Sequence, residues 1–315
     1  MLVGYLSDPD YSAPTICRFL KAHGIDLHPS TITQYRRNKL NLSVMALKRP
    51  ATPAGCKILH IDIETAPAIG ACFGMFKQNL SVDHIIEDPY ILGFSYLWDD
   101  EREKGAQWVS VKNEGRKAML ELAWDLMDEA NYIVHINGTR FDVPWLQGEF
   151  MKDGIRGGIP PSSFKNVDLQ QQTHKKKFRT ISNKLDYITN RFLCLLEGKI
   201  HTEGITLWLK CMGKIGTAAE QAQAWVDMET YANRDVDVMP TIFDKYRPWI
   251  KGLGFNLYSP GEEGCPNCGR TDTLTWGGFT DTDVSRYDAA RCDVDKGGCG
   301  TPVRSTRRRH GVSVR

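Results

Sequence analysis

The stretch KILHIDIET (residues 57–65) decides the fold, because it combines the pattern of a buried strand with two acidic residues. Its β-branched and apolar side chains alternate along the chain, which predicts a β-strand. Asp62 and Glu64 are two residues apart, so both side chains point to the same face of that strand. Carboxylates so close together cannot both ionise cheaply, and a divalent cation removes that cost. Carboxylate oxygens are ligands that Mg²⁺ and Mn²⁺ prefer, so the pair indicates a metal site. The alternative is that this face of the strand is simply exposed to solvent.

The segments that follow predict an α/β domain. Three successive strands come first, and helices then alternate with strands, which indicates a mixed sheet flanked by helices. The predicted strands are 57–65, 90–98, 107–111 and 132–137. The predicted helices are 115–130, a segment around 142–152, 181–196 and 218–246.

Two further aspartates lie where such a fold could bring them to the first pair. Asp142 follows strand 132–137 at a junction between strand and helix, and ligands of α/β sheets gather where strands end. Asp235 lies in a helical segment, one turn after Tyr231, so the two share a helix face. A single helical aspartate is commonly a surface residue, and Asp235 alone therefore predicts little.

Taken in chain order, these residues resemble the motifs of the DnaQ-like, or DEDD, 3′–5′ exonucleases of the ribonuclease H-like superfamily. The matches are Asp62-Ile63-Glu64 followed by Thr65, then Asn137 through Phe141-Asp142, and finally Tyr231 through Asp235. The third match, Tyr-x-x-x-Asp, is that of the tyrosine subgroup (DEDDy). The resemblance covers about residues 56–250 and implies a ribonuclease H-like core.

The resemblance implies hydrolysis of phosphodiester bonds with two bound Mg²⁺ or Mn²⁺ ions. By analogy, Asp62 would bridge both ions, Glu64 and Asp235 would complete one site, and Asp142 would help to position the second ion. Tyr231 would orient the attacking water. The residues expected to contact the substrate are Thr65, Asn137 and Phe141.

The resemblance also indicates the partner and leaves two other functions open. The expected substrate is nucleic acid, with DNA favoured and single-stranded 3′ ends as the reacting part, and a polymerase or replication protein is compatible as a partner. One alternative is a structure-specific endonuclease or resolvase on the same fold. The other is a catalytically inactive nucleic-acid-binding regulator.

Both ends of the chain are basic, although the whole chain carries only +2. Residues 1–50 hold seven Lys and Arg against three Asp and Glu, a net charge of +4. Residues 1–45 predict a small helical module that resembles a helix-turn-helix, with a plain helical arm as the alternative. The Pro- and Ala-rich segment 46–55 is the expected linker.

Four cysteines near the C-terminus form a second pattern. Cys265 and Cys268 have the spacing of a zinc knuckle, and Cys292 and Cys299 form a wider second pair with six residues between them. We expect a structural Zn²⁺ held by all four thiolates in a zinc ribbon over 260–303; a disulfide pair is the alternative. Residues 304–315 then form an expected basic tail that could contact phosphates.

Composition bounds the class of protein. With 41% hydrophobic and 25% charged residues, the chain is ordinary for a globular protein. No apolar run approaches the roughly 20 residues of a membrane helix, and the N-terminus lacks the pattern of a secretory signal. We therefore expect a cytoplasmic protein without a membrane partner. The combination of flanking modules is similar to that of bacteriophage proteins, which would place it in the host cytoplasm.

Overall fold

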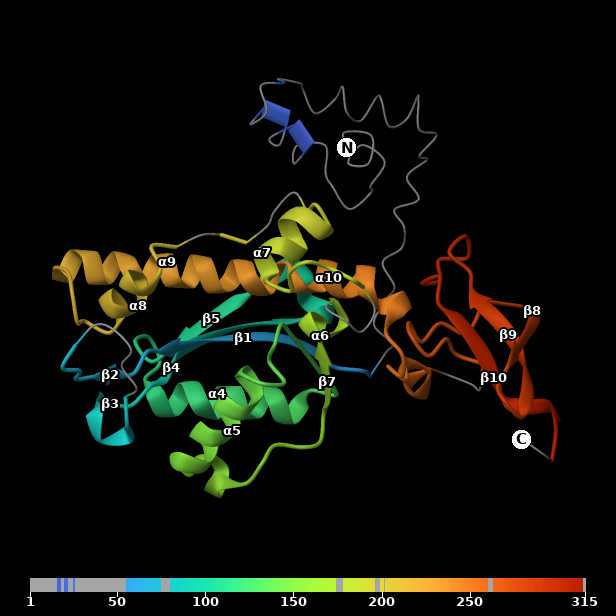
Figure 1. Ribbon diagram of the computed structural model, residues 1–315, viewed down its shortest axis with the longest axis horizontal. Coiled ribbons are helices and arrows are strands. Elements are labelled where there is room, and N and C mark those ends of the chain that lie inside the picture. Colours follow the sequence, from blue (N-terminus) through green and yellow to red (C-terminus); the bar gives the residue numbers. More distant parts are fainter. Residues whose placement is uncertain are drawn as a thin grey trace. The chain divides into compact units, whose positions relative to one another are not determined.

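The computed structural model (Figure 1) describes residues 55–74, 80–173, 178–195, 199–200, 202–259 and 263–313, together with Ile16, Cys17, Leu20, Lys21 and Ile25. The chain divides into two compact units. The sheet unit consists of Cys56–Phe192 and Gly198–Phe243. The other comprises Met1–Gly55, Leu193–Glu197 and Asp244–Arg315, and its part from Asp244 onward is called the C-terminal unit below. Apart from the five residues just named, the predicted helical module at 1–45 lies outside the described residues. The predicted linker 46–55 also lies outside them, except for Gly55.

The sheet unit is built on a five-stranded mixed sheet with the strand order β5-β4-β1-β6-β7. β4 pairs antiparallel with both β1 and β5, whereas β6 pairs parallel with both β1 and β7. The parallel pairing of β1 and β6 requires a long crossover, because a tight hairpin joins antiparallel strands. The strands are β1 (Ile58–Ala66), β4 (Tyr90–Trp98), β5 (Gln107–Ser110), β6 (Tyr132–His135) and β7 (Lys165–Asp168). The expected mixed α/β sheet is therefore confirmed.

Helices cover both faces of this sheet (Figure 1). On one face, Leu59, Ile61 and Ile63 of β1 join a buried core with α4 (Arg116–Glu129) and α5 (Asp142–Lys152). On the other face, α8 (Ile205–Cys211) and α9 (Ala218–Asp237) bury Leu207, Cys211, Ala224 and Met228 in a second cluster. The alternation of β1 therefore sends its apolar residues to one helical layer and its acidic residues toward the other.

Several predicted helices have different bounds in the structure. The segment 218–246 forms two helices, α9 and α10 (Met239–Tyr246), and Pro240 lies at the start of the second, where a missing N–H costs little. α9 begins at a capping box between Thr217 and Glu220. The predicted helix 181–196 is reduced to α7 (Leu185–Tyr187) and a π-turn at Ile188–Phe192.

Short elements complete the sheet unit. β2 (Ile69–Gly70) and β3 (Ile85–Glu87) are short strands that pair with each other in a separate two-stranded sheet. α6 (Leu169–Thr173) follows β7, and single 3₁₀ turns span Val82–His84, Asp99–Lys104 and Ile155–Gly158. No helix in the described part of the chain has the length and apolar character that crossing a membrane requires.

The C-terminal unit contains an antiparallel sheet of order β10-β9-β8, preceded by 3₁₀ turns at Arg247–Trp249 and Phe255–Tyr258. Its strands are β8 (Leu274–Asp281), β9 (Ser285–Cys292) and β10 (Pro302–Gly311). Residues 302–311, which include most of the basic tail expected at 304–315, pair with β9 as an edge strand. Val303, near the start of this strand, packs against the cysteine cluster.

Candidate active site and cysteine cluster

Asp62 and Glu64 lie on the face of β1 opposite to the core that contains Ile61 and Ile63. Glu64 is buried, whereas Asp62 is half-buried. Glu64 accepts a hydrogen bond of 3.1 Å from the indole Nε1 of Trp208, which α8 brings over this face. The acidic pair predicted from the alternation of β1 is therefore enclosed by helices, with its opening to solvent at Asp62.

Asp142 is the first residue of α5 and points back to β1. Its Oδ1 accepts the backbone N–H of Ile63 at 2.9 Å, between the two acidic residues of the strand. The turn before it is tight, since Asn137 has a φ of 68°. A Cβ at Gly138 would lie 2.4 Å from the His135 ring, so glycine is required there. This turn follows β6 and places the Asp142 side chain against the neighbouring strand β1.

Asp235 reaches the same place from α9 and is paired with a lysine. Lys199 Nζ lies 2.5 Å from Asp235 Oδ2 and 4.7 Å from the centre of the Tyr231 ring. Asp235 is buried, and its Oδ1 has no hydrogen-bond partner among the residues that the structure describes. The structure thus brings the helical pair Tyr231 and Asp235 to the acidic residues of β1 and adds a cation that the motifs did not contain.

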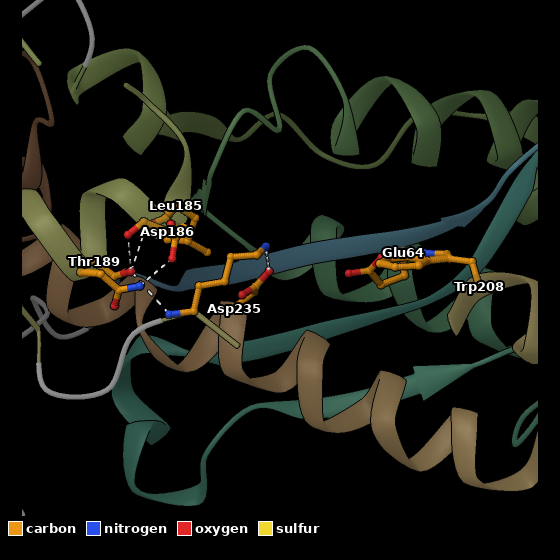
Figure 2. A network of polar contacts seen from close by, with 8 residues as sticks. Glu64, Leu185, Asp186, Thr189, Trp208 and Asp235 are labelled. Carbon is orange, nitrogen blue, oxygen red and sulfur yellow. Dashed lines mark hydrogen bonds and ion pairs between the residues drawn. The ribbon is translucent and has the colours of Figure 1, made fainter. Parts of the chain in front are cut away.

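Figure 2 shows Trp208 beside Glu64, with Asp235 further along β1. The Trp208 ring packs edge-on against Tyr231 with centroids 5.8 Å apart, and its indole donates to Glu64. Neither Trp208 nor Lys199 was among the predicted site residues. Both lie outside the motifs, and no periodicity marks them, so the sequence offered no signal for either.

Burial raises the pKa values of all four carboxyls. It raises the pKa of Asp62 well above its usual range, and Asp142, Glu64 and Asp235 raise it further by charge repulsion. Burial and the charge of Asp235 raise the pKa of Glu64 to about 8. Burial raises the pKa of Asp142 to about 7, and burial also raises that of Asp235 although Lys199 opposes it. Four acids with raised pKa values in one place form a site that favours bound cations.

Lys199 and Tyr231 are affected by the same acids. Burial alone would lower the pKa of Lys199, but the Asp235 carboxylate raises it above its ordinary value. Burial and the charge of Asp235 raise the pKa of the Tyr231 hydroxyl to about 12. At neutral pH, Lys199 is therefore charged, and Tyr231 keeps its proton and can donate a hydrogen bond.

The four carboxylates are spread more widely than the ligands of one ion. The ligand atoms of an octahedral Mg²⁺ lie within about 4.2 Å of each other. In the described part of the chain, no three acidic side chains bring ligand atoms within 4.8 Å of one another. The unpartnered oxygen of Asp235 and the all-oxygen donor set fit hard divalent cations.

The three expected substrate-contacting residues lie around this cluster. Thr65 follows Glu64 on β1 and is half-buried, and Phe141, which directly precedes Asp142, is 38% exposed. Asn137 forms the left-handed turn, and its backbone N–H donates to Asp168 Oδ1 at 3.0 Å. Asp168 was not predicted from the sequence, and it fixes the turn that positions Asp142.

The four C-terminal cysteines form a buried cluster that could hold a metal ion. Their sulfur atoms all lie within 4.8 Å of one another. The distance between the Sγ atoms is 3.7 Å for Cys265 and Cys299, and 3.6 Å for Cys268 and Cys292. All of them are free thiols. The knuckle turn closes through a hydrogen bond from the Gly269 N–H to the Cys265 carbonyl.

A family model supports the fold of the sheet unit. Residues 82–209 match the family model described as RNase_H superfamily. A family B DNA polymerase from the hyperthermophilic archaeon Pyrobaculum calidifontis is similar in structure, with 16% sequence identity and a TM-score of 0.45. That match covers 64% of this chain and 25% of the polymerase, so the chain spans about a quarter of its length. None of the curated proteins compared with the chain matches it. The mixed sheet flanked by helices is consistent with a ribonuclease H-like fold, and the family match supports nuclease activity in general.

Proposed function

We propose that this chain is a metal-dependent 3′–5′ exonuclease of the tyrosine-bearing DnaQ-like (DEDDy) class. The observation that carries the proposal is the convergence of acidic residues from β1, α5 and α9 beside Tyr231. Asp62 interacts electrostatically with its neighbour Glu64 and also with Asp142 and Asp235, which are distant from it in sequence. An array of buried acids without bound cations is costly to assemble, so its presence argues for a ligand of positive charge.

Asp62, Glu64, Asp142 and Asp235 would hold two Mg²⁺ or Mn²⁺ ions. The family that the motifs resemble uses two ions about 3.5–4 Å apart, and four carboxylates supply enough oxygen ligands for such a pair. When bound, such ions supply charge neutralisation at the phosphate and raise the acidity of a water molecule. The chain would contribute the orientation of the reacting groups around them.

Tyr231 is suited to hold the attacking water. With its pKa raised to about 12, the hydroxyl stays protonated at neutral pH and is a hydrogen-bond donor or acceptor and not a base. The exposed Phe141 ring lies next to Asp142 and is available to stack on a terminal base. Thr65, which follows Glu64, and Asn137, in the turn before Asp142, are proposed to contact the same end of the nucleic acid strand.

Substitution of Asp62 tests this function. Asp62→Ala should reduce Mg²⁺-dependent release of nucleotides from a 5′-labelled oligonucleotide about a thousandfold or more, because the ions supply several kcal/mol of transition-state stabilisation. Asp227→Ala is the matched control, since Asp227 is an exposed acid of α9. Undiminished activity of Asp62→Ala would refute the assignment. Cleavage of circular or 3′-blocked DNA would favour an endonuclease, because an exonuclease leaves both intact.

We further propose that the cysteine cluster binds a structural Zn²⁺. Tetrahedral coordination with Zn–S bonds of about 2.3 Å requires sulfur atoms about 3.8 Å apart, and the two observed distances of 3.6 and 3.7 Å are close to that value. We assign residues 56–250 to the nuclease core and 260–303 to this zinc ribbon, whose edge strand β10 continues to Gly311. Atomic absorption should find one zinc per chain, and Cys292→Ser should abolish it. A zinc-free purified protein that keeps its C-terminal unit folded would exclude the site.

A further inference from the structure

The sheet of the C-terminal unit has a strongly basic edge. β10 lies at the edge of the order β10-β9-β8 and contains four arginines and a histidine but no acidic residue. Charged residues on an edge strand also prevent pairing with other chains. That explanation accounts for the charge of β10 but not for the exposed aromatic residues of β8.

One face of this sheet carries two exposed aromatic rings with bare backbone between them. Trp276 and Phe279 of β8 are 42% and 53% exposed, and Gly277 and Gly278 separate them at a shift in the register with β9. A Cβ at Gly277 would meet no atom within 4 Å. These residues line a hollow of about 490 Å³ that extends across the sheet to Arg309.

Arginine side chains are held against aromatic rings on both faces. The Arg309 guanidinium lies 4.9 Å from the centre of the Phe279 ring and donates to Asp288 at 2.8 Å. On the opposite face, the Arg304 guanidinium lies 3.9 Å from the Tyr287 ring. These contacts orient the guanidinium groups along β10 before any ligand binds, and cations over aromatic rings stabilise such positions.

We infer that the face carrying Trp276 and Phe279 binds single-stranded nucleic acid. The bases would stack in the hollow, and the phosphates would lie along β10. Bases stack on aromatic side chains without regard to sequence, and arginine contacts phosphates well. The bases of a duplex are paired and cannot enter the hollow. An acidic peptide could pair with the arginines but would leave Trp276, which is 42% exposed, without a stacking partner. The inference rests on the proposed function for the choice of nucleic acid as partner, and it adds a second contact surface in the C-terminal unit.

Binding can be measured without cleavage. The full chain with its zinc retained, and without added Mg²⁺ or Mn²⁺, is titrated against a fluorescein-labelled 20-nucleotide oligo(dT), and anisotropy gives the dissociation constant. Trp276→Ala should weaken binding about five- to a hundredfold, which is the range for loss of one stacked base. Gly277→Leu should weaken it as well, because it fills the hollow without removing any contact. Leu257→Ala, which truncates an exposed apolar residue outside the sheet, should change nothing.

The charged part of the surface has its own readout. Replacing Arg307, Arg308 and Arg309 together with alanine should reduce the slope of log affinity against log salt by about 0.7 for each lost phosphate contact. Lys251→Ala, which removes one exposed positive charge outside the sheet, should leave the slope unchanged. An oligomer of abasic sites should bind the unaltered chain more weakly than oligo(dT), and Trp276→Ala should not weaken it further.

Three results would overturn the inference. The first is an affinity for oligo(dT) that is unchanged in both Trp276→Ala and Gly277→Leu. The second is an equal affinity of the unaltered chain for duplex and single-stranded DNA. The third is an affinity for poly-glutamate that equals the affinity for oligo(dT) and falls by the same factor in Trp276→Ala. Because these measurements need no catalysis, an active Asp62→Ala would refute the proposed nuclease and leave the binding result interpretable.

Discussion

Lys199 is a positively charged residue among the acids of the candidate site. Its removal should show whether a bound metal ion can neutralise Asp235 in its place. Its Nζ lies 2.5 Å from Asp235 Oδ2, and the two side chains are 24% and 5% exposed. Lys199→Met keeps most of the length of the side chain and removes the charge. In EDTA at pH 8.5, the variant leaves the Asp235 carboxylate buried without its partner.

The size of the effect follows from this burial. Breaking a buried ion pair by removing one partner costs about 3–5 kcal/mol, and the partial exposure of Lys199 reduces that to about 2–3 kcal/mol. For domains of this size, each kcal/mol lowers Tm by about 2–4 °C, so we expect a loss of roughly 5–10 °C in EDTA. With saturating Mg²⁺, the ion neutralises Asp235, and the deficit should shrink to about 1 kcal/mol or less.

Thermal unfolding followed by circular dichroism, with EDTA and with Mg²⁺, tests the reasoning. Lys210→Met is the matched control on α8, since Lys210 pairs at 3.2 Å with Glu203, whose side chain is 71% exposed. Such surface pairs contribute about 0–1 kcal/mol, with no reason to depend on Mg²⁺. If Lys199→Met loses the same stability in EDTA and in Mg²⁺, or no more than Lys210→Met, then Lys199 does not substitute for an ion.

Three further outcomes are expected. A carboxyl whose pKa is higher in the folded than in the unfolded chain stabilises the fold at low pH, and this stabilisation is lost as the pH rises through the folded pKa. The pKa is about 8 for Glu64 and about 7 for Asp142, so Tm in EDTA should fall between about pH 5 and 8 while the affinity for Mg²⁺ rises. A Tm and an affinity that do not change with pH would contradict the assignment. Trp208→Phe removes a hydrogen bond that lowers the pKa of Glu64, so the pH–rate profile of cleavage should move to higher pH; an unshifted profile would separate Trp208 from the chemistry. Tyr231→Phe should slow cleavage roughly ten- to a hundredfold through lost orientation of the water, with Mg²⁺ affinity from calorimetry unchanged, and a large loss of affinity would give Tyr231 a different function.

Much of the fold could be predicted because its main elements are long and strongly patterned. Nine residues of β1 alternate, and α4 and α9 repeat apolar residues at helical spacing, so local sequence alone was sufficient. β7 and α8 span four and seven residues and were missed. Segments so short carry too few repeats to show a period, and α8 is stabilised by burial of Leu207 and Cys211 against α9.

The candidate site divides in the same way. Its acids fall in ordered motifs on regular elements, where spacing and chain order pointed to them. Lys199 and Trp208 act through partners 36 and 144 residues away. No local pattern encodes such distant pairs, since they are created by the packing of α8, α9 and the segment before α8 over β1.

The hydrogen bonds of the site explain why one of these unpredicted residues matters more for ion binding than the other. Three acids each give one oxygen to a donor of the protein: Asp142 to the Ile63 N–H, Glu64 to Trp208 and Asp235 to Lys199. The first two donors are neutral, so they orient a carboxylate without reducing its charge, and the acid can still attract an ion. Lys199 is charged and cancels much of the charge that an ion would use. An ion at Asp235 must therefore compete with Lys199 but not with Trp208, and substitution of Lys199 should change ion binding more than substitution of Trp208.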